Sequence, residues 1–300
     1  MAKTLVVGAT GHLGTEIVNA CRNAGHDVHA LIRPATRGDA AKMQPLQAAR
    51  ATIHEGDLAD YDSLLKACLA VDNVVSVIGS LQIGDEGPLI KAVKDAGVAR
   101  FIPSDFGLDP AAAGPGASAL FDAKIAVQTS IKASGIPYTF VHANAFFSYW
   151  VFSLGDLSKL GGALPPAEVN VYGTGHVKGA FASVADIATV TVRALNDPGM
   201  VNKEVRITAN TMTQTELIDT WQKISGKRVQ HVAVTAAEVE GLIASATAPD
   251  QQMMRIGTEL HRSMWIRGDA VTRAGVALEA TEVYPDIAIQ TVEAGLARLL

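Results

Sequence analysis

A glycine-rich segment near the N-terminus constrains the fold more than any other part of the sequence. The residues "GATGHLG", positions 8–14, follow the apolar run "TLVV" directly and lead into a stretch with helical periodicity. In a strand, loop and helix of this kind, Gly8 permits a tight turn, Gly11 lets the backbone approach a pyrophosphate, and Gly14 allows close helix–sheet packing. Free N–H groups at the start of the helix would then meet the phosphates. The segment therefore predicts a dinucleotide-binding site.

Short β-branched runs alternate with helical stretches along the first half of the chain; the runs include "DVHALIR", "ATIHEGD", "NVVSVIG", "ARFIPS" and "YTFVHA". Strands that alternate with helices of about 10–15 residues indicate βαβ units and a parallel sheet. After about residue 150 the alternation weakens, and "LGDLSKLGGALPPAEVNVYGTG" is rich in glycine and proline, as in a loop or domain crossing.

We therefore expect an α/β fold: a Rossmann-type, doubly wound parallel sheet with a smaller, mostly helical C-terminal substrate domain. The expected dinucleotide-binding domain covers residues 1–155 with 178–208, and the expected substrate-binding domain covers residues 156–177 with 209–300. Local signals mark several helix ends. Left-handed C-terminal caps are expected at Gly25, Gly97, Gly135 and Gly226, and a capping box at Thr213 and Glu216.

The second predicted strand indicates which dinucleotide binds. An NAD site typically has an acidic residue about 20 residues beyond the glycine loop, which accepts hydrogen bonds from the ribose 2′-hydroxyl. Here "HALIRP" places Arg33 in that region, and Arg37 follows soon after. A cation suits a 2′-phosphate, so NADPH is expected over NADH; the alternative is an ordinary surface arginine at a strand end. Asp57, after the third predicted strand, either caps the next turn or approaches the adenine.

Charge and composition argue against several classes of partner. The 300 residues are 48% hydrophobic and 18% charged, with a formal net charge of −5, and lysine and arginine are scattered along the chain. This distribution would not neutralise a nucleic-acid backbone or an anionic membrane, so neither partner is expected. The N-terminal apolar run is too short for a signal peptide or a spanning helix. A homodimer is left open.

The spacing of cysteines and histidines indicates neither disulfides nor a metal site. Cys21 and Cys68 are the only cysteines, and both fall within predicted helices without a recognisable disulfide or metal spacing. The eight histidines are dispersed, with no HxxxH or HExxH arrangement. We therefore expect a reducing, cytoplasmic setting and no metal.

Lys124 interrupts the apolar face of the predicted helix that contains "SALFDAKIAV". At about 100° per residue, Lys124 falls inside the apolar arc formed by Leu120, Phe121, Val127 and Ile131. One interpretation is a lysine whose stem packs on apolar neighbours while its ammonium reaches water. Lys132, nearer the edge of the arc, is interpreted in this way.

The position of this helix in the fold favours a second interpretation for Lys124. The helix follows the fifth predicted strand, so Lys124 would lie by the carboxyl ends of the strands, where a nicotinamide is expected. Partial desolvation and an oxidised nicotinamide ring would help the lysine to give up its proton and act as a general base. Tyrosine-dependent short-chain dehydrogenases carry a Tyr-x-x-x-Lys pair, but the residue four before Lys124 is Leu120. Proton transfer would therefore proceed without that tyrosine.

Several longer blocks together resemble one family: "GATGHLG", "RFIPSDFGLDP", "FDAKIAVQTSIKASGIPYTFVHANAFFSYW", "NKEVRITANTMTQTELIDTWQKISGK" and "YPDIAIQTVEAGL". They are similar to the isoflavone reductase-like branch of the NmrA-like atypical short-chain dehydrogenases. That branch includes phenylcoumaran benzylic ether, pinoresinol–lariciresinol and isoflavone reductases. The resemblance runs from the first predicted strand to the last predicted helix.

The resemblance implies NADPH as cofactor and an aromatic small molecule as substrate. It matches the family's catalytic lysine to Lys124, its 2′-phosphate arginine to Arg33, and its turn beside the nicotinamide to residues 143–146. The full set of expected cofactor-binding residues is Gly8, Thr10, Gly11, His12, Leu13, Gly14, Arg33, Asp57, Gly79, Ser80, Lys124, Asn144 and Phe146. The expected substrate-binding residues are Phe106, Leu108, Phe147, Tyr149 and Trp150. Met253, Met254 and Trp265 are either further pocket walls or plain core.

The mechanism implied by the resemblance begins when the lysine removes a phenolic proton. The electron push opens a benzylic ether to a quinone methide, and hydride from the nicotinamide C4 then adds to the benzylic carbon. The sequence departs from the plant motifs at Asp105, which replaces the glutamate of "PSEFG", and at Ala145, which replaces a common cysteine. The small-residue loop "AAAGPGAS" also suggests a different substrate mouth.

The sequence therefore predicts an NADPH-dependent oxidoreductase that acts on a lignan, a benzylic ether or an isoflavone-like compound. Two alternatives stay open. A redox-sensing regulator of the NmrA type would bind the dinucleotide without catalysis, but it has no need of a lysine at position 124. An NADPH quinone reductase would add hydride to a ring without a lysine-driven ether opening.

Overall fold

The computed structural model describes residues 1–272 and 277–300, which form two compact units. Unit 1 contains Met1–Phe106, Ala123–His142 and Ile187–Val205, and unit 2 contains Gly107–Asp122, Ala143–Asp186 and Arg206–Leu300. Both units are therefore assembled from segments that are distant in the sequence.

The strands of unit 1 are β1 (Lys3–Val7), β2 (Asp27–Ile32), β3 (Thr52–Glu55), β4 (Asn73–Ser76), β5 (Arg100–Ile102), β6 (Thr139–His142) and β10 (Lys203–Arg206). Unit 1 ends at Val205, so the last residue of β10 belongs to unit 2. Five of them form a parallel sheet with the order β3-β2-β1-β4-β5. A parallel bridge between Phe101 and Tyr138 brings β6 next to β5, and β10 lies beside β6. The strand order reverses between β1 and β4, which is where doubly wound sheets bind their ligands.

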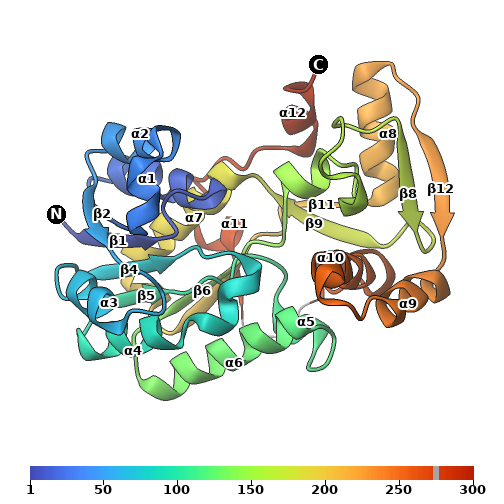
Figure 1. Cartoon of the computed structure of the whole chain (residues 1–300). Helices are drawn as coiled ribbons and strands as arrows, with labels where there is room; N and C mark the ends of the chain where they lie inside the picture. Colours follow the sequence, from blue (N-terminus) through green and yellow to red (C-terminus); the bar gives the residue numbers. More distant parts are fainter. Residues whose placement is uncertain (273–276) are drawn as a thin grey trace. The chain divides into compact units, whose positions relative to one another are not determined.

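Helices cover both faces of this sheet. The helices are α1 (His12–Asn23), α2 (Ala40–Ala48), α3 (Tyr61–Cys68), α4 (Gly87–Asp95), α6 (Ala119–Ser134) and α7 (Val184–Asn196), with short 3-10 turns η1 (Pro34–Gly38), η2 (Ser80–Asp85) and η5 (Pro198–Met200). In Figure 1, α1, α2 and α7 lie on one face, and α3, α4 and α6 lie on the other. This arrangement is the predicted Rossmann-type sheet.

The core of unit 1 explains why its strands carry long apolar runs. Leu5, Val74, Phe101 and Phe140, from four neighbouring strands, are fully buried together with Ile131 of α6. A strand covered by helices on both faces has no side that meets water, so its residues are apolar in succession rather than in alternation.

Unit 2 combines two small sheets with helices. Its strands are β7 (Ala145–Phe146), β8 (Glu168–Tyr172), β9 (Lys178–Ala182), β11 (Asn210–Thr213), β12 (Gln230–Val234) and β13 (Leu278–Glu279). Its helices and turns are α5 (Pro110–Ala113), α8 (Gln214–Ser225), α9 (Ala236–Ser245), α10 (Gln252–His261), α11 (Ala280–Val283), α12 (Val292–Ala297), η3 (Phe147–Val151), η4 (Leu157–Lys159), η6 (Pro249–Gln251) and η7 (Arg262–Arg267). One sheet has the order β11-β9-β7, and β12 pairs with β8 in parallel.

One expectation for the second half of the chain needs correction. The Gly/Pro-rich stretch expected to be a loop contains strand β8, because the residues of "EVNVY" pair with β12 in parallel register and bury Val169 and Tyr172. The C-terminal part carries strands β11 and β12 in addition to its helices.

The boundaries of the units also differ from the expected domain boundaries. Residues 107–122, 143–155, 178–186 and 206–208 belong to unit 2 rather than to the nucleotide-binding domain. The reason is packing, because Phe147 and Phe181 from these segments lie in the same buried apolar cluster as Trp265.

The predicted helix ends are confirmed. The four glycines expected as caps, at positions 25, 97, 135 and 226, have φ between 66° and 80°, in the left-handed region. Thr213 and Glu216 form the predicted capping box at the start of α8.

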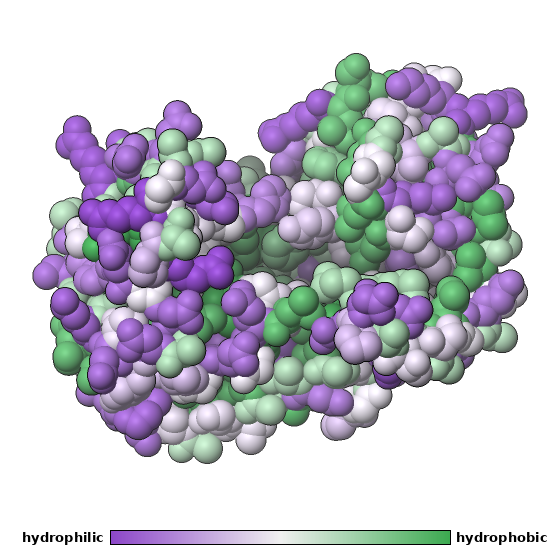
Figure 2. Space-filling model, in the orientation of Figure 1, coloured by the Kyte–Doolittle hydropathy of each residue, from purple (hydrophilic) through white to green (hydrophobic). Residues whose placement is uncertain are grey.

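Hydrophilic and hydrophobic residues are mixed over the visible face of each unit in Figure 2. Within the described residues, no helix combines the length and the apolar character that crossing a membrane requires.

Candidate functional site

The glycine loop of unit 1 packs as its sequence predicts. Gly8 has φ +83°, and the N–H of Gly11 donates to the carbonyl of Gly8 over 3.0 Å, which closes a tight turn before α1. A Cβ on Gly14 would lie 2.1 Å from the carbonyl oxygen of Gly8, so only glycine lets α1 approach the loop this closely. The first N–H groups of α1 consequently face the end of β1.

A pocket of about 230 Å³ opens beside this loop in unit 1. Its walls come from the residues that follow β1, β2, β3 and β4, and the predicted residues among them are Gly8, Thr10, Gly11, Arg33, Asp57 and Gly79. The pocket therefore lies at the carboxyl edge of the sheet, beside the point where the strand order reverses. The sequence analysis did not include Thr36 and Gln82, which also line it.

The polar residues of the pocket differ in their surroundings. Arg33 is exposed at the end of β2 and lines the pocket, whereas Arg37 forms an ion pair with Glu55. Asp57 lines the pocket and also accepts a hydrogen bond of 3.0 Å from the N–H of Ala59. Asp57 therefore caps the turn, as one interpretation states, and its approach to the adenine stays a prediction.

Three further residues predicted to bind the cofactor surround the loop. His12 and Leu13 begin α1, with His12 exposed and Leu13 buried. Ser80 is exposed at the start of η2, directly after Gly79.

Lys124 is buried on α6, with 5% of its side chain exposed. Its Nζ donates a hydrogen bond of 3.0 Å to the backbone carbonyl of Asp105 and lies 4.0 Å from the Asp105 carboxylate. Lys124 therefore does not extend to the surface as an ordinary lysine does. Lys132 is different, because its side chain is 46% exposed and pairs with Glu204 at 2.9 Å.

A hydrogen bond connects the Lys124 region with the wall of the pocket. Ser104, which precedes Asp105, donates from Oγ to the carbonyl of Ile78 over 2.9 Å, and Ile78 lines the pocket. The segment whose backbone accepts the Lys124 hydrogen bond is therefore bonded to the chain that follows β4.

Three ionisable or polar groups surround Asp105. Gln128 Nε2 donates to the carboxylate over 2.8 Å, and His142 Nδ1 lies 3.2 Å from the same oxygen. Glu86 is fully buried, and its carboxylate accepts the N–H of Ser104 over 3.4 Å. Burial is the main cause that raises the pKa of Glu86 to about 7, and the nearby Asp105 charge adds to it.

The sequence analysis missed these neighbours of Asp105, although two kinds of signal were present. Gln128 stands four residues after Lys124, on the same face of the helix. His142 ends the strand TFVH, which is buried throughout, and an ionisable side chain in such a strand needs a buried partner. Glu204 lies in the charged strand KEVR, which gave no comparable signal.

Unit 2 contains the other residues predicted to bind cofactor. Asn144 has φ +56°, its N–H donates to Gly107 over 2.8 Å, and its side chain donates to the carbonyl of Ile207 over 2.9 Å. A non-glycine residue held in this conformation is frequent at functional sites. Phe146 is half-buried and stacks on Tyr149 with ring centroids 6.0 Å apart.

The predicted substrate-binding residues fall into two groups. Leu108, Phe147 and Trp150 are buried in the apolar cluster of unit 2, as is Trp265. Phe106 is half-buried, and Tyr149 is 44% exposed. Met253 and Met254 are exposed on α10.

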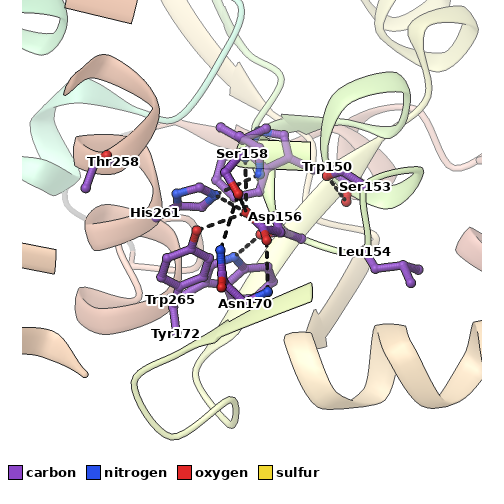
Figure 3. Close-up of polar contacts among 12 residues, drawn as sticks. Trp150, Ser153, Leu154, Asp156, Ser158, Asn170, Tyr172, Thr258, His261 and Trp265 are labelled. Carbon is purple, nitrogen blue, oxygen red and sulfur yellow. Dashed lines mark hydrogen bonds and ion pairs between the residues drawn. The ribbon is translucent and has the colours of Figure 1, made fainter. Parts of the chain in front are cut away.

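A second buried polar cluster lies in unit 2, around Asp156 (Figure 3). The Asp156 carboxylate accepts hydrogen bonds from Ser158 N and Oγ, from Asn170 N and from the Tyr172 hydroxyl, at 2.6–3.0 Å. Burial, followed by the charge of Asp156, raises the pKa of Tyr172 above its usual range. The ring of Tyr172 stacks on His261 with centroids 4.0 Å apart.

His261 is a neutral member of this cluster. Its Nε2 accepts the N–H of Leu157 over 2.9 Å, and burial lowers its pKa to about 4. Because Asp156 is fully buried and its oxygens are already hydrogen-bonded, we interpret the cluster as the attachment of the segment before β8 to α10.

Among residues 1–272 and 277–300, no group of three or more His, Cys, Asp or Glu side chains is arranged to hold a metal ion.

Comparison with known proteins gives a consistent result. The model of the NmrA-like family matches residues 1–294. The chain is 38% identical to pinoresinol reductase 1 of Arabidopsis thaliana over 301 residues, which cover 95% of this chain and 93% of that protein. It is 35% identical to eugenol synthase 1 of Petunia hybrida over 304 residues, which cover 97% of this chain and 96% of that protein.

A solved structure shares the fold over its whole length. The pinoresinol reductase AtPrR2 with NADP⁺ and (+)-pinoresinol aligns with a TM-score of 0.88 and 32% identity, covering 100% of this chain and 99% of that chain.

Proposed function

The chain belongs to the NmrA-like family, and from this premise we propose that it is an NADPH-dependent reductase of an aromatic, phenylpropanoid-type substrate, with Lys124 as general base. The observation that carries the proposal is the buried position of Lys124, whose Nζ donates to the backbone of Asp105, next to the Ser104 that is hydrogen-bonded to the pocket wall. Gly8 and Gly11 close the tight turn, Gly14 lets α1 approach it, and Arg33 supplies a cation at the end of β2.

These residues fit a dinucleotide phosphate. Backbone N–H groups at the start of α1 would bind the pyrophosphate, and Arg33 would pair with a 2′-phosphate. Asn144 and Phe146 are proposed to bind near the nicotinamide, as the resemblance implies. When bound, NADPH supplies the hydride.

Lys124 is proposed to move one proton. Its Nζ takes the proton of a substrate phenol, and the electron pair left on the phenolate breaks a benzylic C–O bond to give a quinone methide. After reduction at the benzylic carbon, the new phenolate recovers its proton from Nζ. The oxygen freed by the C–O cleavage takes a second proton from solution.

The substrate class is proposed from relatives that share 35–38% identity with this chain. They are named as a pinoresinol reductase and a eugenol synthase, and AtPrR2 holds (+)-pinoresinol. Phe106, Phe146 and Tyr149 are the partly exposed aromatic residues proposed to contact the substrate ring. For Leu108, Phe147 and Trp150, burial in the apolar cluster favours a supporting role.

Lys124→Ala tests the general base. We expect turnover of lignans, phenylcoumarans or isoflavones to fall by about 100-fold or more, because general-base catalysis typically contributes a factor of this order. NADPH binding, followed by quenching of protein fluorescence, should stay within about twofold of wild type, because the pocket around Arg33 is intact. Lys94→Ala, at an exposed lysine of α4, is the matched control and should retain full turnover.

Turnover by the Lys124→Ala variant at the wild-type rate would exclude the lysine mechanism. Oxidation of NADPH with quinones alone, unaffected by the substitution, would indicate the quinone reductase instead. NADPH binding without turnover of any aromatic substrate by the wild type would favour the regulator.

A further inference from the structure

Five ionisable side chains form a row inside unit 1, and we call it the charge row. It consists of Lys124, Asp105, His142, Glu204 and Lys132. Successive members are separated by 4.0 Å, 3.2 Å, 3.0 Å and 2.9 Å between their closest nitrogen and oxygen atoms. His142 is at the centre, and it is fully buried.

Both neighbours of His142 are carboxylates. Its Nδ1 faces Asp105 and its Nε2 faces Glu204, so both ring nitrogens lie close to carboxylate oxygens. A neutral imidazole has only one N–H, and its second nitrogen would turn a lone pair toward a carboxylate. An imidazolium would place a positive charge beside both carboxylates, with Nε2 hydrogen-bonded to Glu204 at 3.0 Å and Nδ1 3.2 Å from Asp105 Oδ2. The row then alternates in charge from Lys124 to Lys132.

The surroundings of Glu204 agree with a charged His142. Burial acts to raise the pKa of Glu204, but hydrogen bonds from His142 and Lys132 outweigh it and lower the pKa to about 2. Glu204 is therefore ionised throughout the neutral range and keeps a negative charge beside His142.

His142 and Lys124 compete for the same carboxylate. The Oδ2 atom of Asp105 faces His142 and accepts the hydrogen bond of Gln128, whereas Oδ1 lies 4.0 Å from Lys124 Nζ. Lys124 donates instead to the backbone carbonyl of Asp105. A buried carboxylate in direct contact would hold the lysine proton, which a general base must give up. The imidazolium offsets that negative charge.

The other charged groups near the row leave this balance intact. Glu86 interacts with Asp105 and Lys124 from the turn before α4 and, because burial raises its pKa to about 7, it is only partly ionised near neutrality. Arg100 of β5, the strand beside β6, donates to Thr139 Oγ1 and to the carbonyl of Ala194. Of the charged residues of α6, Lys124 and Lys132 belong to the row, and Asp122 accepts the N–H of Gly116.

We propose that His142 is a positioning residue: a permanently protonated imidazolium that, through Asp105, holds Lys124 in place and lets it release its proton near neutrality. The proposal rests on the role of Lys124 given above. It adds His142, which is not part of the glycine loop, to the residues on which the reaction depends.

Nitrogen-15 NMR of histidine-labelled protein tests the protonation state without turnover. Both ring nitrogens of His142 should give the shifts of N–H groups from pH 6 to pH 8.5, above the ordinary histidine pKa of about 6.5. Comparison with His142→Asn assigns the signal. A His142 that loses a proton near or below pH 6.5 would overturn the proposal.

Glu204→Gln is a second test of the protonation state, because it keeps His142 and leaves a hydrogen-bonding side chain at position 204. With only one carboxylate beside it, the imidazolium of His142 should lose one of its two ring protons at a pH below 8.5. No change in the His142 signals would contradict the alternating row. This variant also assigns the signal if His142→Asn does not fold.

His142→Asn tests the effect on Lys124. Asparagine can still donate to Asp105 but carries no charge, so Asp105 should hold the lysine proton more firmly. The ionisation of Lys124, followed by carbon-13 NMR of the lysine Cε atoms, should move up by about one pH unit or more. The rising limb of kcat/KM against pH should move by the same amount.

His26→Asn is the matched control, because His26 is another buried histidine of unit 1 and bonds to Thr4 rather than to a carboxylate. The His26→Asn substitution should change neither the ionisation of Lys124 nor the dependence of kcat/KM on pH. An unshifted Lys124 in folded His142→Asn would overturn the positioning role. Turnover that survives Lys124→Ala would overturn the proposed function, while the NMR result on His142 would still decide its protonation state.

Discussion

Two arginines that follow β2 differ in what they contact. Arg33 is exposed and lines the pocket beside the glycine loop, whereas the guanidinium of Arg37 pairs with Glu55 and lies outside the lining of the pocket. The sequence analysis named both as cations near a 2′-phosphate. At the scale of single residues, the structure favours Arg33 for that contact, because only Arg33 shares a pocket with Gly8 and Gly11.

Arg33→Asp is therefore expected to reverse the cofactor preference. A charge-assisted contact with a phosphate is worth about 1.5–3 kcal/mol, so KM for NADPH should rise by roughly 10- to 100-fold. KM for NADH should fall or stay constant, since aspartate can accept from a ribose 2′-hydroxyl. Steady-state kinetics with both cofactors measures this, and Arg37→Asp is the matched control. An equal effect of the two substitutions would contradict the assignment.

At the scale of secondary-structure elements, the glycine loop and α1 pack closely against each other. The ideal Cβ position of Gly14 is 2.1 Å from the carbonyl oxygen of Gly8 and 2.9 Å from Cα of Ala9. These neighbours are backbone atoms and cannot rotate away. The N-terminus of α1 can therefore face the pocket only while residue 14 has no side chain.

Gly14→Ala should move α1 away from the loop. We expect a loss of about 1–3 kcal/mol in the free energy of unfolding, as for overpacked cores, and at least tenfold weaker NADPH binding. Gly241→Ala, in the exposed part of α9 with open space around it, is the control and should stabilise the protein by about 0.5–1 kcal/mol. Urea unfolding and a fluorescence titration with NADPH measure both effects. Normal cofactor binding by Gly14→Ala would show that the packing is not required.

At the scale of the whole molecule, buried ionisable groups make stability depend on pH in opposite directions. Burial raises the pKa of Glu86 to about 7, so its contribution is present at low pH and is lost as pH rises from about 4.5 through 7. Burial lowers the pKa of His261 to about 4. Between about pH 6.5 and 4 the unfolded chain binds a proton there that the folded chain does not, so stability falls as pH falls.

The His261 effect is expected to amount to about 3 kcal/mol between pH 6.5 and 4. His261→Gln can keep an acceptor for the N–H of Leu157 but has no ionisation, so unfolding of unit 2 should become less dependent on pH in this range. Urea unfolding at several pH values, followed by tryptophan fluorescence, measures the slope. His231→Gln, at an exposed histidine of β12, is the control. A slope in His261→Gln as steep as in wild type would assign the pH dependence to other groups.

The sequence by itself determined the features that depend on neighbours along the chain. The parallel sheet, the glycine loop, the capping glycines and the capping box all follow from local spacing, because each is satisfied within a few residues or one βαβ unit. The burial of Lys124 was also predictable, since helical periodicity places it inside an apolar arc. The assignments of residues to cofactor and substrate remain predictions that the experiments above address.

Only the tertiary structure decided which distant residues meet. Asp105, His142 and Glu204 come from three segments spread over about a hundred residues, and no periodicity links them. The same holds for the unit boundaries, where Phe147 and Phe181 pack into the core of unit 2. Burying a charge is costly unless a partner of opposite charge is buried with it, and only the folded chain shows which partner is near. For this reason the sequence indicated Lys124, and the fold showed that His142 and Asp105 accompany it.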